Sequence, residues 1–224
     1  MRRLLTGLLA AFSLLSFTST ANRSPRFVGH IDTRILGDLA PGDVVFVTLP
    51  DAFWAVIASE TSLASYRHGH VGVVVDVGPK GAFVVDASGN PSQENAVVVR
   101  ESLETFAQGA SAIDVFRPVD AQAARVEAET AREFARNRLG FDSGFSLETK
   151  DRLYCSELVW RALSKGFGRD IIPVKSRLAG RDAILLSDLE TSRYLKPFST
   201  SRTAVAMATI ARSARADIGQ ANVP

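Results

Sequence analysis

The chain of 224 residues is almost free of cysteine, because Cys155 is the only one. A single cysteine excludes an internal disulfide, and it excludes the cysteine clusters that hold structural zinc. What remains is one free thiol. A free cysteine is either a small buried hydrophobic residue or a reactive group, and its position alone leaves both interpretations open.

Histidine is also scarce, and several motifs are missing altogether. The three histidines are His30, His68 and His70. No His-x-x-x-His pair, glycine-rich phosphate loop or paired-carboxylate motif occurs, so we expect no metal site and no cofactor. The 26 basic and 24 acidic residues do not separate into clusters, which gives no support for nucleic-acid binding.

The N-terminus has the features of an export signal. An apolar run over residues 4–17 follows Arg2 and Arg3, and residues 19–21 form a small-x-small site. The run is shorter than the roughly 20 residues of a membrane-spanning helix. We therefore predict that residues 1–21 are a cleaved signal peptide, with an uncleaved anchor as the alternative, and that the protein is periplasmic or secreted. An unpaired thiol in such an oxidising compartment suggests a reactive role.

The remaining chain is long enough for one domain with a sizeable core. We expect an irregular segment over residues 22–38, a domain over 39–198, and a flexible or loosely helical tail over 199–224. Within the domain a meander of strands comes before two long helices, which indicates an α+β fold with a central antiparallel sheet. The predicted strands cover residues 44–47, 70–77, 82–87, 96–100 and 112–117, and the predicted helices cover 52–64, 102–107, 121–139 and 155–165.

The helix that begins at Cys155 is amphipathic. Leu158, Val159 and Leu163 follow Cys155 at helical spacing and would place the thiol on the inward face. Cys155 also falls in the first turn, where unpaired N–H groups and the helix dipole favour negative charge. A thiol in this position should ionise readily.

A cysteine nucleophile needs a nearby base, and the base needs a partner that orients it. His70 opens a strand, whereas His68 precedes it in a polar segment. Asp86 interrupts the next, otherwise apolar strand, where a carboxylate is costly unless it is paired. A symmetric hairpin would set Asp86 opposite Val73, so a bulge or a change of register is needed to bring it onto the face of His70.

Each of these polar residues has an ordinary structural alternative. His70 could be a surface residue, and Asp86 could cap the turn that follows its strand. Ser88 and Asn90 are alternative orienting residues. Tyr154 could donate a hydrogen bond to an oxyanion or simply pack in the core.

Four segments in this order resemble a known family. They are residues 41–46 (PGDVVF), 70–74 (HVGVV), 86–87 (DA) and 154–159 (YCSELV), and they are similar to the permuted NlpC/P60 family, the YiiX/YebB-like group of papain-fold cysteine hydrolases. In ordinary NlpC/P60 enzymes the cysteine helix precedes the histidine strand, whereas in the permuted group it follows, as here. The resemblance covers roughly residues 39–195.

This resemblance implies a papain-like fold, with Cys155 as nucleophile, His70 as base and Tyr154 at the family's tyrosine position. The third family residue is typically Glu, and the matching position here holds Asp86, which is one methylene shorter. The implied substrates are amide bonds of peptides or cell-wall fragments, and a related branch acts on lipid acyl groups. Acyl transfer, or binding of a lipid or peptide without catalysis, are the alternatives. Association with the cell envelope would fit each of them.

Overall fold

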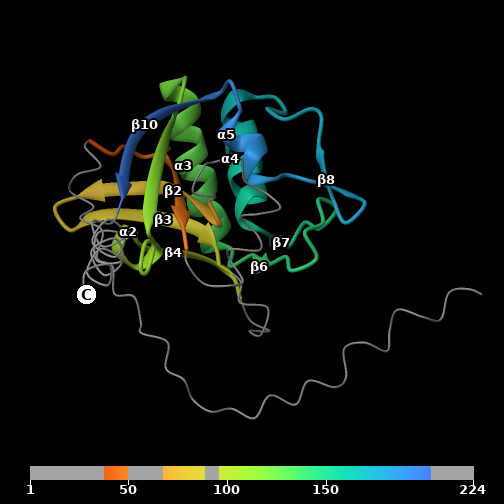
Figure 1. Cartoon of the computed structure of the whole chain (residues 1–224), viewed down its shortest axis with the longest axis horizontal. Coiled ribbons are helices and arrows are strands. Elements are labelled where there is room, and N and C mark those ends of the chain that lie inside the picture. Colours follow the sequence, from red (N-terminus) through yellow and green to blue (C-terminus); the bar gives the residue numbers. More distant parts are fainter. Residues whose placement is uncertain (1–37, 50–67, 89–95, 203–224) are drawn as a thin grey trace, which may run out of the picture.

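Six strands, most of them rich in β-branched residues, pair into one antiparallel sheet (Figure 1). The structure is a computed structural model and describes residues 38–49, 68–88 and 96–202. The predicted signal peptide, the predicted helix over 52–64, His30 and Asn90 lie outside these residues. The strand order is β10-β5-β1-β2-β3-β4. These strands are β1 (Val44–Thr48), β2 (His70–Gly78), β3 (Gly81–Ala87), β4 (Val98–Ser102), β5 (Ala112–Pro118) and β10 (Leu195–Arg202).

Helices cover both faces of this sheet. The four described helices are α2 (Leu103–Phe106), α3 (Ala121–Arg136), α4 (Cys155–Phe167) and α5 (Leu186–Glu190). Two small sheets join β6 (Gly140–Phe141) to β7 (Arg152–Leu153) and β8 (Ser176–Leu178) to β9 (Arg181–Ala183). The predicted α+β class with a central antiparallel sheet is therefore confirmed.

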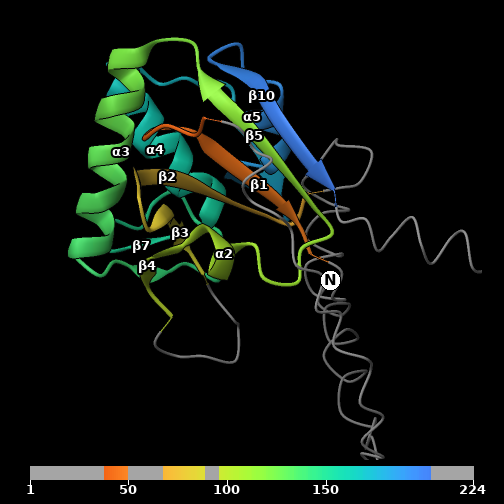
Figure 2. The same ribbon diagram turned by 90° about the vertical axis from the view of Figure 1, so that its left-hand side faces the viewer.

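The two faces of the sheet form two separate cores. On one face, alternate strand residues such as Val71 and Val73 pack against α4 and α5, with Leu158 of α4 in the same core. Figure 2 shows α3 and α4 side by side on this face. On the other face, Val45 and Val47 pack with Phe106 of α2. Strands β1 and β2 are thus buried on both sides, which explains why their β-branched residues form continuous runs.

The ends of the two long helices follow local sequence signals. Asp120 is the N-cap of α3, because its side chain accepts a hydrogen bond from Ala123 N at 2.7 Å. This helix ends at Arg136, three residues before the predicted end. Helix α4 ends at Phe167, and Gly168 caps it in the left-handed conformation with φ of 64°.

The C-terminal part of the domain differs from the prediction. The tail was expected to begin at residue 199, but β10 continues to Arg202 and pairs with β5 along its length. Between β9 and β10 the chain also forms α5, which is not among the predicted helices. The domain therefore reaches beyond its predicted boundary at residue 198.

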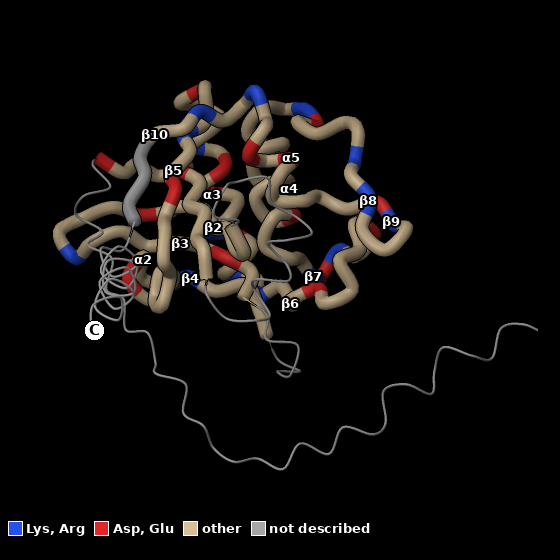
Figure 3. Tube along the Cα trace, viewed as in Figure 1, with Lys and Arg blue, Asp and Glu red and all other residues tan. Residues whose placement is uncertain are grey.

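Charged residues of both signs are interspersed over the described elements (Figure 3). No helix in the described ranges is both long enough and apolar enough to cross a bilayer.

Candidate active site

His70 and Asp86 meet at one end of the sheet. His70 is the first residue of β2, and Asp86 is the last but one of β3, so the antiparallel pairing puts both beside each other. His70 Nε2 lies 2.9 Å from Asp86 Oδ2. The Asp86 side chain is fully buried and that of His70 nearly so. A buried carboxylate on an imidazole nitrogen fixes the orientation and the proton of the ring.

A bulge in β2 makes this contact possible. Near the turn the register is the symmetric one, with Asp76 opposite Phe83. The register then shifts between Val74 and Asp76, so that Val73 pairs with Val85 and no longer with Asp86. One extra residue in β2 reverses the face onto which the preceding residues point, which is the change that the sequence required.

Helix α3 stabilises the bulge from outside the sheet. Arg132 donates a hydrogen bond to the carbonyl oxygen of Val75, the extra residue. It also lies 3.2 Å from Asp76, which accepts a second hydrogen bond from Arg100 at 2.8 Å. The carbonyl that the bulge leaves out of the ladder is therefore satisfied.

Gly72 lies between His70 and the bulge, where there is no room for a side chain. A Cβ atom at this position would be 2.5 Å from Val84 Cγ1, 3.1 Å from the Val85 carbonyl oxygen and 3.2 Å from Asp86 Cβ. The absence of a side chain at Gly72 thus allows β3 and the Asp86 carboxylate to approach β2 closely.

Cys155 approaches the same imidazole from α4. It is the first residue of the helix, it is buried, and it belongs to the core that holds Leu158 and Val159. The first intrahelical hydrogen bond is donated by Leu158 N to Tyr154 O, so the backbone N–H groups of residues 155–157 have no acceptor within the helix. Such groups stabilise negative charge at this position.

The environment holds a proton on His70. Burial disfavours the charged imidazole and on its own would lower the pKa of His70. The negative charge of Cys155 and the hydrogen bond to Asp86 outweigh burial, and the pKa rises from 6.5 to about 10. His70 thus interacts with both Cys155 and Asp86.

The two residues that flank Cys155 hold a distant segment. The Tyr154 hydroxyl accepts a hydrogen bond from Ile184 N at 2.8 Å, and Ser156 Oγ donates one to Ile184 O at 2.7 Å. Tyr154 and Ser156 are both buried. The bond from Ile184 N holds the Tyr154 ring in a packed position, but it uses the hydroxyl only as an acceptor, so the oxyanion role of its O–H group stays a prediction.

Glu157 closes the first turn of α4 from the inside. Its fully buried carboxylate lies 2.6 Å from Arg161 Nη2 and accepts a weaker hydrogen bond from Tyr154 N at 3.4 Å. Burial raises the pKa of Glu157 to about 7, although Arg161 opposes that shift. This pair fixes the backbone of the turn that carries Cys155.

One carboxyl group near the site, that of Glu101, was missed in the sequence. Ser88 donates a hydrogen bond to Asp86, as the turn-capping alternative expected. Glu101 of β4 pairs with Val84, so its side chain projects from the same sheet face as Asp86. Burial and the charge of Asp86 raise the pKa of Glu101 to about 7, while His70 acts in the opposite direction.

His68 belongs to a different cluster. Its Nε2 lies 2.8 Å from Asp114 Oδ2 and its Nδ1 lies 2.9 Å from Glu190 Oε1. Both ring nitrogens thus face carboxylates of β5 and α5. The residue joins the start of β2 to these two elements.

Three comparisons with known proteins bear on this site. A family model described as a permuted papain-like amidase enzyme, YaeF/YiiX, C92 family, matches residues 38–178. Among solved structures, the metalloprotein YiiX from Escherichia coli O157:H7 is similar, with a TM-score of 0.53 and 18% identity over 70% of this chain and 94% of that chain. At this identity the likeness concerns the fold alone. No curated protein matches the chain.

The description of YiiX as a metalloprotein concerns that protein. Within residues 38–49, 68–88 and 96–202 no group of three or more His, Cys, Asp and Glu side chains is arranged to hold a metal ion. His68 could not serve both as a ligand and as the partner of two carboxylates, since each of its nitrogens already faces one.

Proposed function

This chain belongs to the permuted papain-like amidase family, a family of cysteine-type hydrolases, and on that premise we propose that it cleaves amide bonds through Cys155, His70 and Asp86. The observation that carries the proposal is the 2.9 Å contact between His70 and Asp86, together with the interaction of the same imidazole with Cys155. A nucleophile that contacts a base, and a carboxylate that orients the base, form the arrangement that thiol hydrolases use.

The first half of the reaction makes a thioester. With His70 protonated, Cys155 rests as a thiolate and attacks the carbonyl carbon of the substrate. The backbone N–H of Cys155, in the first turn of α4, is directed at the oxyanion that forms. The imidazolium of His70 gives its proton to the amine as the C–N bond breaks, which leaves a neutral imidazole and an acyl group on Sγ.

The second half releases the acid. Neutral His70 takes a proton from water, and the resulting hydroxide adds to the thioester carbonyl carbon. The C–S bond then breaks, so that the thiolate and the imidazolium are restored and the acyl group leaves as a carboxylic acid. Asp86 keeps its contact with Nε2 throughout and holds the ring in one orientation.

The proposed setting is the cell envelope. The N-terminal signal supports export to the periplasm or the medium. Peptides and cell-wall fragments are the amide substrates found there, and acyl lipids are the alternative carbonyl substrates. The fold is compatible with both, so the assay must compare amides with esters.

The test is hydrolysis of a peptide amide panel and an acyl-ester panel by the full chain and by Cys155→Ala. We expect wild-type turnover of amides and no measurable turnover by the variant. Full amidase activity in Cys155→Ala would overturn the proposal. Preferred turnover of acyl esters would keep the site and change the substrate.

Alkylation of the thiol tests the site without a substrate. A thiolate held by an imidazolium reacts with iodoacetamide at a rate that stays level between about pH 6 and 8. We expect this level profile in the wild type and a rising profile in His70→Gln. Labelling that requires denaturant in the wild type would show an inert, buried thiol.

A further inference from the structure

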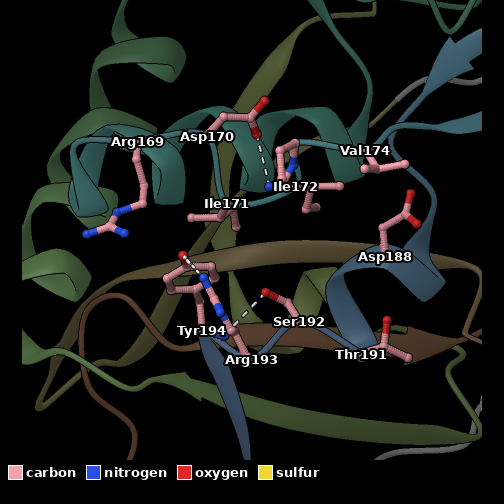
Figure 4. A pocket seen from close by; sticks show the side chains of 11 residues that line it. Arg169, Asp170, Ile171, Ile172, Val174, Asp188, Thr191, Ser192, Arg193 and Tyr194 are labelled. Atoms are coloured by element: carbon pink, nitrogen blue, oxygen red, sulfur yellow. Dashed lines mark hydrogen bonds between the residues drawn. The ribbon is translucent and has the colours of Figure 1, made fainter.

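A cavity lies at the far end of α4 from Cys155. Its volume is about 690 Å³, and it is lined by residues 169–174 after α4 and by Asp188, Thr191, Ser192, Arg193 and Tyr194 (Figure 4). Helix α4 has 13 residues. At a rise of 1.5 Å per residue, the cavity is therefore about 20 Å from the catalytic cysteine. A volume of this size lies in the range of small-molecule sites.

One end of the cavity is positively charged. Arg193 Nη2 donates a hydrogen bond to the Tyr194 hydroxyl at 3.0 Å. Arg193, through this bond, and Arg169 both lower the pKa of Tyr194, so the two guanidinium groups converge on one oxygen. Within the described part of the chain no carboxylate lies within salt-bridge distance of either arginine, so the charge of this pair is not neutralised.

The acidic residues of the cavity are already engaged. Asp170 accepts hydrogen bonds from Trp160 Nε1 at 2.7 Å and from Ile172 N at 2.9 Å. Asp188 accepts hydrogen bonds from Ser176 Oγ at 2.7 Å and from Leu185 N at 2.8 Å. In Figure 4 the Asp188 carboxylate lies at the end away from Arg169 and Tyr194. A ligand therefore meets uncompensated positive charge at one end only.

Apolar side chains form the rest of the surface. Ile171 and Ile172 are buried beneath the cavity, whereas Val174 at the rim is 85% exposed. An apolar portion of a ligand would remove this valine from water while it lies over the isoleucines.

We propose that this cavity binds a small anion that carries an apolar chain, with its phosphate or carboxylate group on Arg169 and Arg193. Guanidinium groups bind such planar or tetrahedral oxyanions through paired hydrogen bonds. The apolar chain lies along Ile172 and Val174. The site is independent of Cys155 and of the proposed hydrolysis.

Calorimetric titration of the full-length Cys155→Ala variant tests the site without turnover. The probes are hexyl phosphate, hexanoate, hexanol and inorganic phosphate. We expect the two amphiphilic anions to bind at least about tenfold more tightly than either hexanol or inorganic phosphate, because both parts of the ligand contribute. Equal affinity for inorganic and hexyl phosphate would reduce the site to plain attraction of anions and would overturn the proposal.

Variants locate the binding. Arg169→Gln and Arg193→Gln should each lower the affinity for hexyl phosphate by about tenfold, since each removes a charged hydrogen bond. Arg181→Gln is the matched control, because Arg181 is an exposed arginine outside the cavity. An equal loss in the control would show that surface charge alone attracts the ligand and would contradict the site.

The same anionic group occurs on lipid headgroups, and vesicles separate the two sources. Sedimentation with vesicles of phosphatidylglycerol and phosphatidylcholine is the probe. We expect the protein to bind free hexyl phosphate in the absence of vesicles. Vesicle binding that depends on both arginines, without binding of free hexyl phosphate, would identify a membrane surface as the ligand and would overturn the small-molecule site.

Discussion

At the scale of single residues, the candidate site depends on Asp86, a carboxylate one methylene shorter than the glutamate that the family resemblance implies at this position. Asp86 reaches His70 because the bulge in β2 and the missing side chain of Gly72 bring the strands close. The chain thus compensates for the lost methylene through its backbone. Changes of charge and changes of spacing at this position should therefore have different effects.

Asp86→Asn keeps the shape and removes the charge. Because Asp86 is one of the groups that raise the pKa of His70 to about 10, the variant should lose the imidazole proton at lower pH. We expect kcat to fall roughly 100- to 10,000-fold, with the alkaline limb of the pH–rate profile shifted to lower pH. Steady-state kinetics over a pH series measures both.

Ser88→Ala is the matched control for Asp86→Asn. It removes one hydrogen bond to Asp86 and leaves the charge in place. Its loss of kcat should be about tenfold or less. If Asp86→Asn kept the wild-type kcat and profile, Asp86 would have no role in orienting His70.

A second prediction concerns Glu127 of α3, which lies outside the site. It is fully buried, and neither of its carboxyl oxygens has a hydrogen-bond partner among the described residues. Burial, with the nearby charge of Asp43, raises its pKa well above 4.5. The stability that follows from this neutral form is complete below the unfolded pKa and is lost as the pH rises through the folded pKa.

Glu127→Gln removes that dependence, because a glutamine does not titrate. We expect the free energy of unfolding of the variant, relative to the wild type, to increase with pH by up to about 1.4 kcal/mol per pH unit in this window. Urea denaturation at several pH values measures it. Exposed Glu148→Gln should give a pH-independent difference, and the same flat result for Glu127→Gln would contradict the prediction.

The reactive residue types could be identified from the sequence, but their surroundings could not. Cys155 is the only thiol, and Asp86 is unusual within an apolar strand, so both are visible in the sequence. Glu127 lies among the buried alanines of α3, and from the sequence alone a glutamate in a helix is expected to face water. The bonds of Tyr154 and Ser156 to Ile184 join positions about 30 apart and depend on tertiary packing.

At the scale of elements, the β2–β3 hairpin carries most of the site. Its two strands were predicted within one residue of their observed ends, because their β-branched runs are bounded by turn residues. The need for a bulge was visible in the sequence, but its place at Val75 was not. That position depends on Arg132 of α3, a residue that no local pattern connects to β2.

Gly72→Ala tests this close approach. The added methyl group would meet the stiff, buried Val84 side chain and the backbone of Val85. We expect the free energy of unfolding to fall by about 1–3 kcal/mol, and kcat to fall with it as Asp86 moves away from His70. Thermal unfolding and steady-state kinetics measure the two effects.

Gly78→Ala is the control in the same strand, since a Cβ there has no heavy atom within 4 Å. It should leave stability and kcat nearly unchanged. Adding Val84→Ala to Gly72→Ala should restore part of the loss, because it removes the atom nearest to the new methyl group. Equal effects of the two glycine substitutions would mean that the clash is not the cause.

Among the elements that were missed, α5 and β10 have weak local signals. Helix α5 has only five residues, which is too short for a helical period to be recognised. Strand β10 contains Pro197 among polar residues and resembles a tail. Its place at the edge of the sheet explains why a proline is tolerated there.

At the scale of the whole molecule, the fold extends past the residues that the family model matches. That match ends at residue 178. Beyond it, Ile184 holds both neighbours of Cys155, Glu190 lies against His68, and β10 pairs with β5. The nucleophile helix is thus supported by segments outside the matched region.

A chain that ends at residue 178 should therefore fail to fold cooperatively. It lacks β9, α5 and β10, and it leaves β5 as an open edge. A chain that ends at residue 202 retains every described element and should unfold at nearly the wild-type temperature. Circular dichroism during heating compares the two, and a wild-type transition in the shorter chain would show that the terminal elements are dispensable.

The order of the site residues along the chain also has a consequence for biosynthesis. His70 and Asp86 are 16 positions apart and belong to one hairpin, whereas Cys155 follows much later. A chain emerges from the ribosome with its N-terminal part first, so this hairpin is available to fold before the cysteine has been made. The permuted order therefore delays the thiol until its partners exist. A nascent chain that stops early carries no nucleophile, and the completed chain gains one only when its last long helix docks.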